Sequence, residues 1–244
     1  MTGLRSALFN LLFYGLTTIV VILCLPLILY PPAILRLSEI WTASTMWLLA
    51  HICGLSYEIR GAEFRATGTP VMYAVKHQSA WETLAMVLLL PRPVYILKKE
   101  LLRIPLFGWY LRQTGHIAID RRGGAGTLRT MATEAKAALA AGRPVLIFPE
   151  GTRAPPGTTG RFHPGIAALY MQLKVPVVPV ALNSGLFWGR RTFRKRPGRI
   201  TVEFLPPIPP GMKPRAFLAE LEHRIEDATR RLEAEVTAAG DPIE

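Results

Sequence analysis

The hydrophobic pattern divides the chain into an apolar N-terminal part and a longer part of alternating short apolar runs. Residues 7–30 carry no charged side chain, and a helix of that length rises about 36 Å, enough to cross the hydrocarbon core of a bilayer. A second apolar stretch, residues 40–55, is shorter and contains His51, which is typical of an interfacial or re-entrant segment. The pattern predicts an N-terminal membrane-associated helical hairpin over residues 1–55, with two core helices of a soluble protein as the alternative.

The first apolar stretch is predicted to be a retained anchor. Arg5 precedes it, and Pro31 and Pro32 follow it, where we expect the helix to end. No small-residue cleavage site follows, and the apolar run is longer than the h-region of a usual signal peptide.

Residues 56–244 show the alternation of strands and helices that is typical of an α/β domain. Strands are predicted at residues 57–59, 71–75, 94–97, 116–119, 145–148, 177–182 and 200–204. Helices are predicted at residues 79–90, 127–141, 165–173 and 214–236, the last with an apolar stripe for packing on the core. The sequence therefore predicts a single α/β domain with a mostly parallel or mixed sheet flanked by helices, in which functional residues gather at the loops that follow strands.

Composition narrows the possible function classes. Half of the 244 residues (50%) are hydrophobic, and 29 Lys and Arg against 17 Asp and Glu give a net charge of +12. This composition excludes a disordered chain and a disulfide scaffold, and the charge favours a polyanionic partner, which is nucleic acid, an anionic membrane surface or a phosphorylated substrate. Cys24 and Cys53 lie in apolar segments, and without a zinc-type motif we expect no metal.

A basic run near residue 190 is a separate feature of the charge pattern. It comprises Arg190, Arg191, Arg194, Lys195, Arg196 and Arg199, flanked by Phe187, Trp188 and Phe193. Charge and aromatic rings together suit single-stranded nucleic acid, but the chain also carries a membrane-length segment and lacks RNA- and DNA-binding motifs. We therefore expect the run to dock on anionic membrane lipids, and nucleic acid is an unlikely partner.

The first of two candidate loops spans residues 76–83 and directly follows a predicted strand. If His77 lies outside the helix that follows, its imidazole can meet the carboxylate of Glu82, which then orients the histidine as a base for a hydroxyl group. The alternative is structural, because Ser79 and Glu82 have the spacing of a capping box. The spacing alone leaves both interpretations open.

The second candidate loop, residues 148–153, reads Phe-Pro-Glu-Gly-Thr-Arg and also follows an apolar strand. Gly151 allows close approach of the backbone to a ligand, Thr152 offers a hydroxyl group, and Arg153 offers a planar fork suited to phosphate.

Four motifs in a fixed order resemble the glycerolipid acyltransferase family, and within it most closely the 1-acyl-glycerol-3-phosphate (lysophosphatidic acid) acyltransferases. They are the His-x4-acid loop, the segment Gly-x3-Ile-Asp-Arg at residues 115–121, the Phe-Pro-Glu-Gly-Thr-Arg loop, and Val-Pro-Val-Val-Pro-Val at residues 175–180. The resemblance runs from about residue 76 to residue 184.

The resemblance implies roles for individual residues. His77 matches the catalytic histidine, and Glu82 stands where the family usually has aspartate. Arg121, in the second motif, helps to hold the acceptor phosphate, and Lys98 resembles a basic position that precedes this motif. The third motif implies acceptor binding by Glu150, Gly151, Thr152 and Arg153. Lys76 is a departure, because the family commonly has asparagine there.

The implied reaction moves an acyl chain from acyl-CoA or acyl carrier protein to the sn-2 hydroxyl of 1-acyl-glycerol-3-phosphate, giving phosphatidic acid. We expect general-base catalysis without an acyl-enzyme and no cofactor beyond the acyl donor. The expected location is the inner membrane, with the catalytic domain on the cytoplasmic face. Two alternatives stay open, an acyltransferase for another lysophospholipid or a lyso-amino-lipid, and a non-catalytic protein that binds membranes or nucleic acid.

Overall fold

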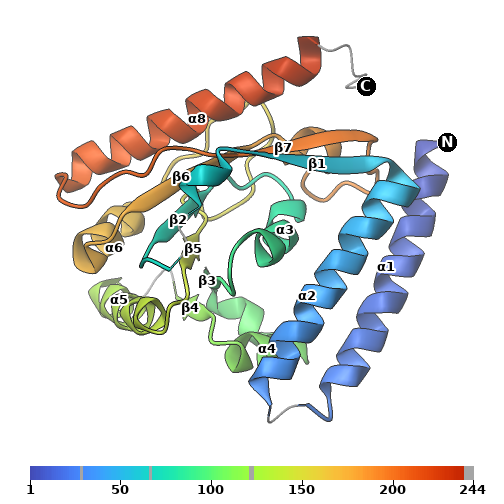
Figure 1. Ribbon diagram of the computed structural model, residues 1–244, viewed down its shortest axis with the longest axis horizontal. Coiled ribbons are helices and arrows are strands. Elements are labelled where there is room, and N and C mark those ends of the chain that lie inside the picture. The colour runs from blue at the N-terminus through green and yellow to red at the C-terminus, as the bar shows by residue number, and fades with distance from the viewer. Residues whose placement is uncertain (28–29, 66–67, 121–123, 239–244) are drawn as a thin grey trace.

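The protein, described by a computed structural model over residues 1–27, 30–65, 68–120 and 124–238, is built on a mixed seven-stranded sheet (Figure 1). The strands are β1 Leu55–Arg60, β2 Met72–Val75, β3 Val94–Lys98, β4 Ile117–Ile119, β5 Val145–Ile147, β6 Val177–Leu182 and β7 Gly198–Phe204. Their order across the sheet is β1-β7-β6-β2-β5-β3-β4. Every strand lies at a place where the sequence pattern predicts one.

The sheet direction brings separate motifs to one edge. β6, β2, β5, β3 and β4 are parallel to one another, whereas β7 pairs antiparallel with β6 and parallel with β1. The expectation of a mostly parallel or mixed sheet is therefore confirmed. Because parallel strands end on the same side, the loops that follow β2, β3, β5 and β6 meet along one edge of the sheet.

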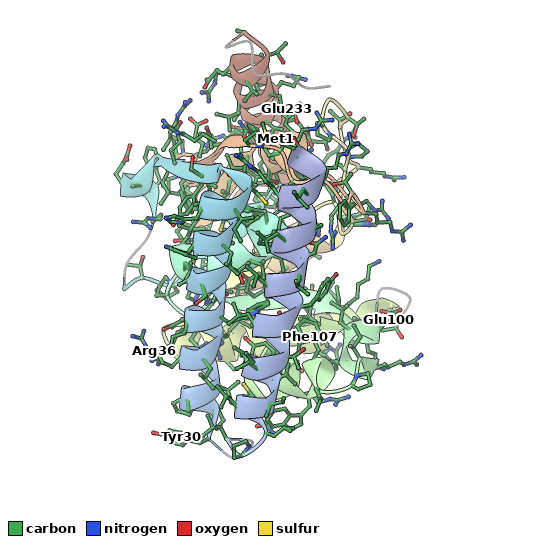
Figure 2. All side chains as sticks on the ribbon, turned by 90° about the vertical axis from the view of Figure 1, so that its right-hand side faces the viewer. Met1, Tyr30, Arg36, Glu100, Phe107 and Glu233 are labelled. Atoms are coloured by element: carbon green, nitrogen blue, oxygen red, sulfur yellow. The ribbon has the colours of Figure 1, made fainter. Side chains whose placement is uncertain are left out.

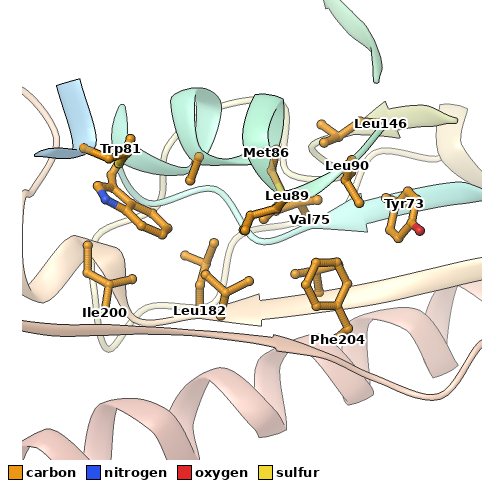
Figure 3. Packing of buried hydrophobic residues seen from close by; sticks show 14 of the residues in the cluster. Tyr73, Val75, Trp81, Met86, Leu89, Leu90, Leu146, Leu182, Ile200 and Phe204 are labelled. Carbon is orange, nitrogen blue, oxygen red and sulfur yellow. The ribbon is translucent and has the colours of Figure 1, made fainter. Parts of the chain in front are cut away.

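Helices cover both faces of the sheet. One face packs against α3, Trp81–Leu89, and the other against α5 Gly124–Ala140, α6 Gly165–Leu173 and α8 Pro214–Ala238. In β2, Tyr73 and Val75 face the α3 side, and Met72 and Ala74 face the opposite side. Both faces are buried, which explains why the central strands are continuous apolar runs. Figure 3 shows the packing of α3 residues such as Trp81 over the central strands.

The N-terminal hairpin consists of two antiparallel helices that lie side by side (Figure 2). They are α1 Thr2–Cys24 and α2 Pro31–Leu48, and α2 continues into a π-helical turn, η1 Leu49–Cys53. The prediction placed the second apolar segment at residues 40–55 and is wrong at its start. Pro31 and Pro32 begin α2 because the first turn of a helix leaves its N–H groups free and so accepts proline.

The hairpin is attached to the domain by its inner face only. Phe9, Met46, Leu49 and Cys53 belong to the same apolar cluster as α3 and the central strands. The outer face of α1 is exposed and apolar, and little of the helix is buried against the rest of the protein. Among the described residues, α1 is the one helix long and apolar enough to cross a membrane.

Short helices between the strands were not predicted. They are η2 Ala62–Phe64, η3 Lys99–Arg103, α4 Phe107–Gln113 and α7 Ser184–Phe187. Pro105, Gly108 and Gly115 interrupt the apolar periodicity near α4, so the sequence around it resembles a loop. The predicted stripe on α8 is confirmed, since Phe217, Leu221, Ile225, Ala228, Leu232 and Val236 are all buried.

Candidate active site

A cavity of about 840 Å³ lies at the edge where the parallel strands end. Its polar lining comes from the loops after the strands and includes His77, Lys98, Thr152 and Arg153. Its apolar lining comes largely from the helices around that edge, among them Trp41, Leu84, Val87, Phe107, Tyr110 and Leu111. The cavity therefore joins a cationic, hydrogen-bonding wall to a wall that suits hydrocarbon.

His77 and Glu82 meet as the first candidate loop predicts. Nδ1 of His77 lies 2.8 Å from Oε1 of Glu82, and the carboxylate is fully buried while 14% of the imidazole is exposed. With a carboxylate as its partner, Nδ1 carries the proton, so Nε2 keeps a lone pair. The ring stacks on Phe148 with 4.1 Å between centroids, which fixes the plane of the imidazole.

The same carboxylate caps the start of α3. Oε1 of Glu82 accepts hydrogen bonds from the backbone N–H groups of Gln78 and Ser79 at 2.7 and 2.6 Å. Ser79 Oγ accepts from the N–H of Trp81 at 3.1 Å. The Oε2 atom of Glu82 accepts from the hydroxyl of Ser184, after β6, at 2.7 Å. The histidine contact and the structural cap therefore coexist on one side chain.

Lys76 is completely buried between two carboxylates. Its Nζ lies 2.6 Å from Oε1 of Glu150 and 2.7 Å from Oε1 of Glu226. Burial raises the pKa of Glu150, and the nearby ammonium of Lys76 opposes this change. These three residues, called the buried ion triad below, connect the ends of β2 and β5 with α8.

Glu150 lies behind His77 and is absent from the described lining of the cavity. Its Oε2 accepts a hydrogen bond from the backbone N–H of His77 at 2.9 Å. The carbonyl of His77 accepts a second bond from the N–H of Ala154 at 2.8 Å. Glu150 and Ala154 therefore hold the backbone of the histidine on both sides, and binding of the acceptor by Glu150 stays a prediction.

The other predicted site residues divide by position. Lys98, Gly151, Thr152 and Arg153 line the cavity, and Gly151 has a left-handed φ of +63° that lets the loop turn toward it. Arg121 lies outside the described residues. Among the residues that the structure does describe, no group of three or more His, Cys, Asp or Glu side chains is arranged to hold a metal ion.

Sequence reasoning missed the contribution of α8. Glu226 completes the buried ion triad, and Glu233 accepts hydrogen bonds from Gln78 Nε2 at 2.6 Å and from the N–H of Gly157 at 2.9 Å. Glu226 follows Ile225 of the apolar stripe, so its burial can be inferred only when the orientation of α8 on the sheet is known.

His116, which the sequence left without a role, also lines the cavity. Its Nδ1 accepts a hydrogen bond from the N–H of Tyr95 at 3.2 Å. Burial lowers the pKa of His116 to about 3, so this imidazole stays neutral and the proton sits on Nε2.

A model of the acyltransferase family matches residues 56–183, more than half of the chain. The chain belongs to the acyltransferase family. The resemblance of the four motifs is thereby confirmed, as is the expectation of an O-acyltransferase. The family match ends before α8, the helix that supplies Glu226 and Glu233.

Curated relatives and a solved structure agree with this assignment. The 1-acyl-sn-glycerol-3-phosphate acyltransferase of Pseudomonas aeruginosa is 38% identical over 198 residues, which cover 81% of this chain and 76% of the relative. The alpha enzyme of the same name from Bos taurus is 32% identical over 79% of this chain and 69% of the relative. The crystal structure of the 1-acyl-sn-glycerophosphate (LPA) acyltransferase PlsC from Thermotoga maritima has the same fold, with a TM-score of 0.78, 20% identity, and coverage of 96% and 98% of the two chains.

The buried ion triad makes a stability prediction. Lys76→Met leaves two buried carboxylates without their cation, and we expect a loss of about 3–5 kcal/mol in the free energy of unfolding. Urea unfolding in detergent measures this loss. The control is Lys136→Met on the exposed side of α5, which should change stability by about 0.5 kcal/mol or less. Equal stability of the two variants would contradict the prediction.

The place of Glu150 makes a kinetic prediction. Gln at position 150 keeps a carbonyl oxygen for the N–H of His77, whereas Ala leaves this N–H without a partner, at a cost of about 1–3 kcal/mol. We expect kcat to fall further in Glu150→Ala than in Glu150→Gln, with little change in KM for the acceptor. A rise in KM for the acceptor at constant kcat would instead indicate direct contact with substrate.

Proposed function

We propose that this acyltransferase moves an acyl chain from an acyl thioester to the sn-2 hydroxyl of 1-acyl-glycerol-3-phosphate, giving phosphatidic acid. The observation that carries the proposal is the contact between His77 and Glu82 in a cavity lined by Lys98 and Arg153. The names of the curated relatives support the same substrate. The donor is acyl-CoA or acyl carrier protein, since both present the thioester on a phosphorylated carrier.

The proposed chemistry follows from the residues of the site. Nε2 of His77 takes the proton of the acceptor hydroxyl as its oxygen attacks the thioester carbonyl, and Glu82 stabilises the resulting imidazolium. The carbon–sulfur bond breaks, the thiolate leaves, and the proton on His77 passes to it. A thioester is already activated, so this route needs no acyl-enzyme.

The cavity lining suits a lysophospholipid. Lys98 and Arg153 are the described motif cations that can hold the acceptor phosphate, and so bring the hydroxyl close to His77. The apolar wall from α2, α3 and α4 suits the acyl chain. The volume of about 840 Å³ is within the range of small-molecule sites.

A membrane location is part of the proposal. Apolar side chains such as Leu8, Leu11, Ile19 and Ile22 are exposed along α1. The length and the apolar composition of this helix suit a bilayer. Trp41 of α2 lines the cavity, so a hairpin in the membrane places the site beside its lipid substrate. Acyl thioesters are made in the cytoplasm, which favours the inner membrane with the domain on its cytoplasmic face.

Loss of the proposed base should stop the reaction. We expect His77→Ala, and to a smaller extent Glu82→Gln, to lower kcat by about 10²- to 10⁴-fold, with binding of the lipid retained. Thiol release from acyl-CoA on addition of lysophosphatidic acid, read with DTNB, measures this. Substantial turnover by folded His77→Ala protein would remove the histidine from the mechanism.

The same assay with a panel of acceptors separates the alternatives. Release that needs lysophosphatidic acid supports the proposal, and release only with another lysophospholipid or with a lyso-amino-lipid supports a related acyltransferase. No release with any donor or acceptor supports a non-catalytic binding protein.

The membrane proposal predicts how the full-length protein fractionates. It should stay with the membrane pellet after an alkaline carbonate wash, because α1 offers apolar surface that only hydrocarbon covers. Introducing Leu11→Arg and Leu12→Arg together should release more protein, because both residues are exposed near the middle of α1. Each Arg costs about 2.5–3.5 kcal/mol at the centre of a membrane helix. Complete release of the unmodified protein by high salt would contradict an inserted anchor.

A further inference from the structure

Two cavity cations lie outside the motifs that define the family. The charged residues that line the cavity are Lys98, Asp120, Arg153, Arg190 and Arg191, besides its histidines. Arg190 and Arg191 are exposed as well as cavity-lining, so they lie where the cavity opens to solvent. Within the described ranges neither forms an ion pair with a carboxylate, and Arg190 Nη1 donates to the carbonyl of Arg153 at 3.4 Å.

The turn that carries these arginines has an unusual backbone. The N–H of Thr192 bonds the carbonyl of Gly189 at 3.3 Å, which places Arg190 and Arg191 at the tip of the turn. Arg191 has a φ of +58°, a left-handed conformation that any residue with a Cβ adopts at a cost and that glycine adopts freely. Such strain is typical of functional sites. An arginine is present where the backbone favours glycine.

The loop is fixed from behind by Lys195. Its Nζ donates to Asn10 Oδ1 at 2.5 Å and to the carbonyl of Phe193 at 3.0 Å. The rings of Phe9, Trp188 and Phe193 surround the ammonium, with centroids 5.1–5.7 Å from Nζ. Lys195 is 3% exposed. It is therefore unavailable to the membrane lipids that the sequence pattern assigned to the whole basic run, and it instead holds the turn rigidly on α1.

We propose that Arg190 and Arg191 form a phosphate-binding subsite at the opening of the cavity, an inference that rests on the proposed function. Its ligand is a phosphate group of one of the two substrates, either on the acceptor or on the phosphorylated carrier of the acyl donor. A guanidinium group without a carboxylate partner is ready to take an anion, and its planar fork matches phosphate oxygens. Because the turn is fixed, the guanidinium groups of Arg190 and Arg191 lose little conformational freedom on binding.

Arg191→Gly tests the subsite because a binding role predicts a higher KM without any loss of thermal stability. Glycine relieves the backbone, so the melting temperature should equal or exceed that of the unmodified protein. Loss of the guanidinium group of Arg191 should raise KM by about ten-fold for the substrate whose phosphate it holds. The kcat should stay close to that of the unmodified protein. KM measured separately for acyl-CoA and for lysophosphatidic acid identifies the source of the phosphate. Arg190→Ala should raise the same KM.

Arg194→Ala is the matched control, since Arg194 is an exposed cation of the same loop that is not among the residues lining the cavity. It should leave both KM values unchanged. The subsite is overturned if Arg191→Gly and Arg190→Ala leave both KM values unchanged, including the case in which they weaken only binding to anionic vesicles.

A binding experiment keeps this test separate from the proposed reaction. Coenzyme A and lysophosphatidic acid are titrated into His77→Ala protein with and without Arg191→Gly. A ten-fold weaker affinity for one of them supports the subsite even if the protein turns over no substrate. Equal affinities for both ligands overturn it, whereas absence of turnover by the unmodified protein alone counts against the proposed function.

Discussion

The ammonium group of Lys76 is buried at the end of the central strand, and a buried charge must be neutralised where it lies. The carboxylates of Glu150, in the loop after β5, and of Glu226, in α8, supply the neutralising charge. Glu150 then uses its second carboxylate oxygen to hold the backbone of His77. The position of the histidine is thus a consequence of local charge balance, and three segments far apart in the chain are fixed relative to one another by one cation.

Much of the fold could be predicted because its physical signals are local. The seven strands are short apolar runs, and the stripe of α8 repeats at helical spacing. The start of α2 was missed because proline ends one helix and begins another equally well. The contact of His77 with Glu82 was one of two interpretations that the spacing within one loop left open, and the structure contains both. The carboxylates of α8 were not foreseen, since their role depends on which helix face meets the sheet edge, a tertiary fact with no local signature.

The two interpretations of Glu82 compete in the sequence but not in the structure. A buried carboxylate that accepts two backbone N–H groups and a serine hydroxyl has little freedom to move. That rigidity is what a histidine needs from the group that orients it. Glu82 reaches Ser184, the first residue of α7, and the segment that follows β6 thereby supports the contact. The structural cap therefore holds the carboxylate in place for the general-base role proposed for His77.

The place of α8 has a consequence for how the protein is made. Glu226 and Glu233 belong to the last helix, yet they bond to the loops around His77. The hairpin and the strands with their motif loops all precede α8 in the chain. The loops around the histidine gain these two partners only after α8 has been synthesised. Assembly of the loops around His77 is therefore completed only after α8 has been made, when all seven strands of the sheet have already been synthesised.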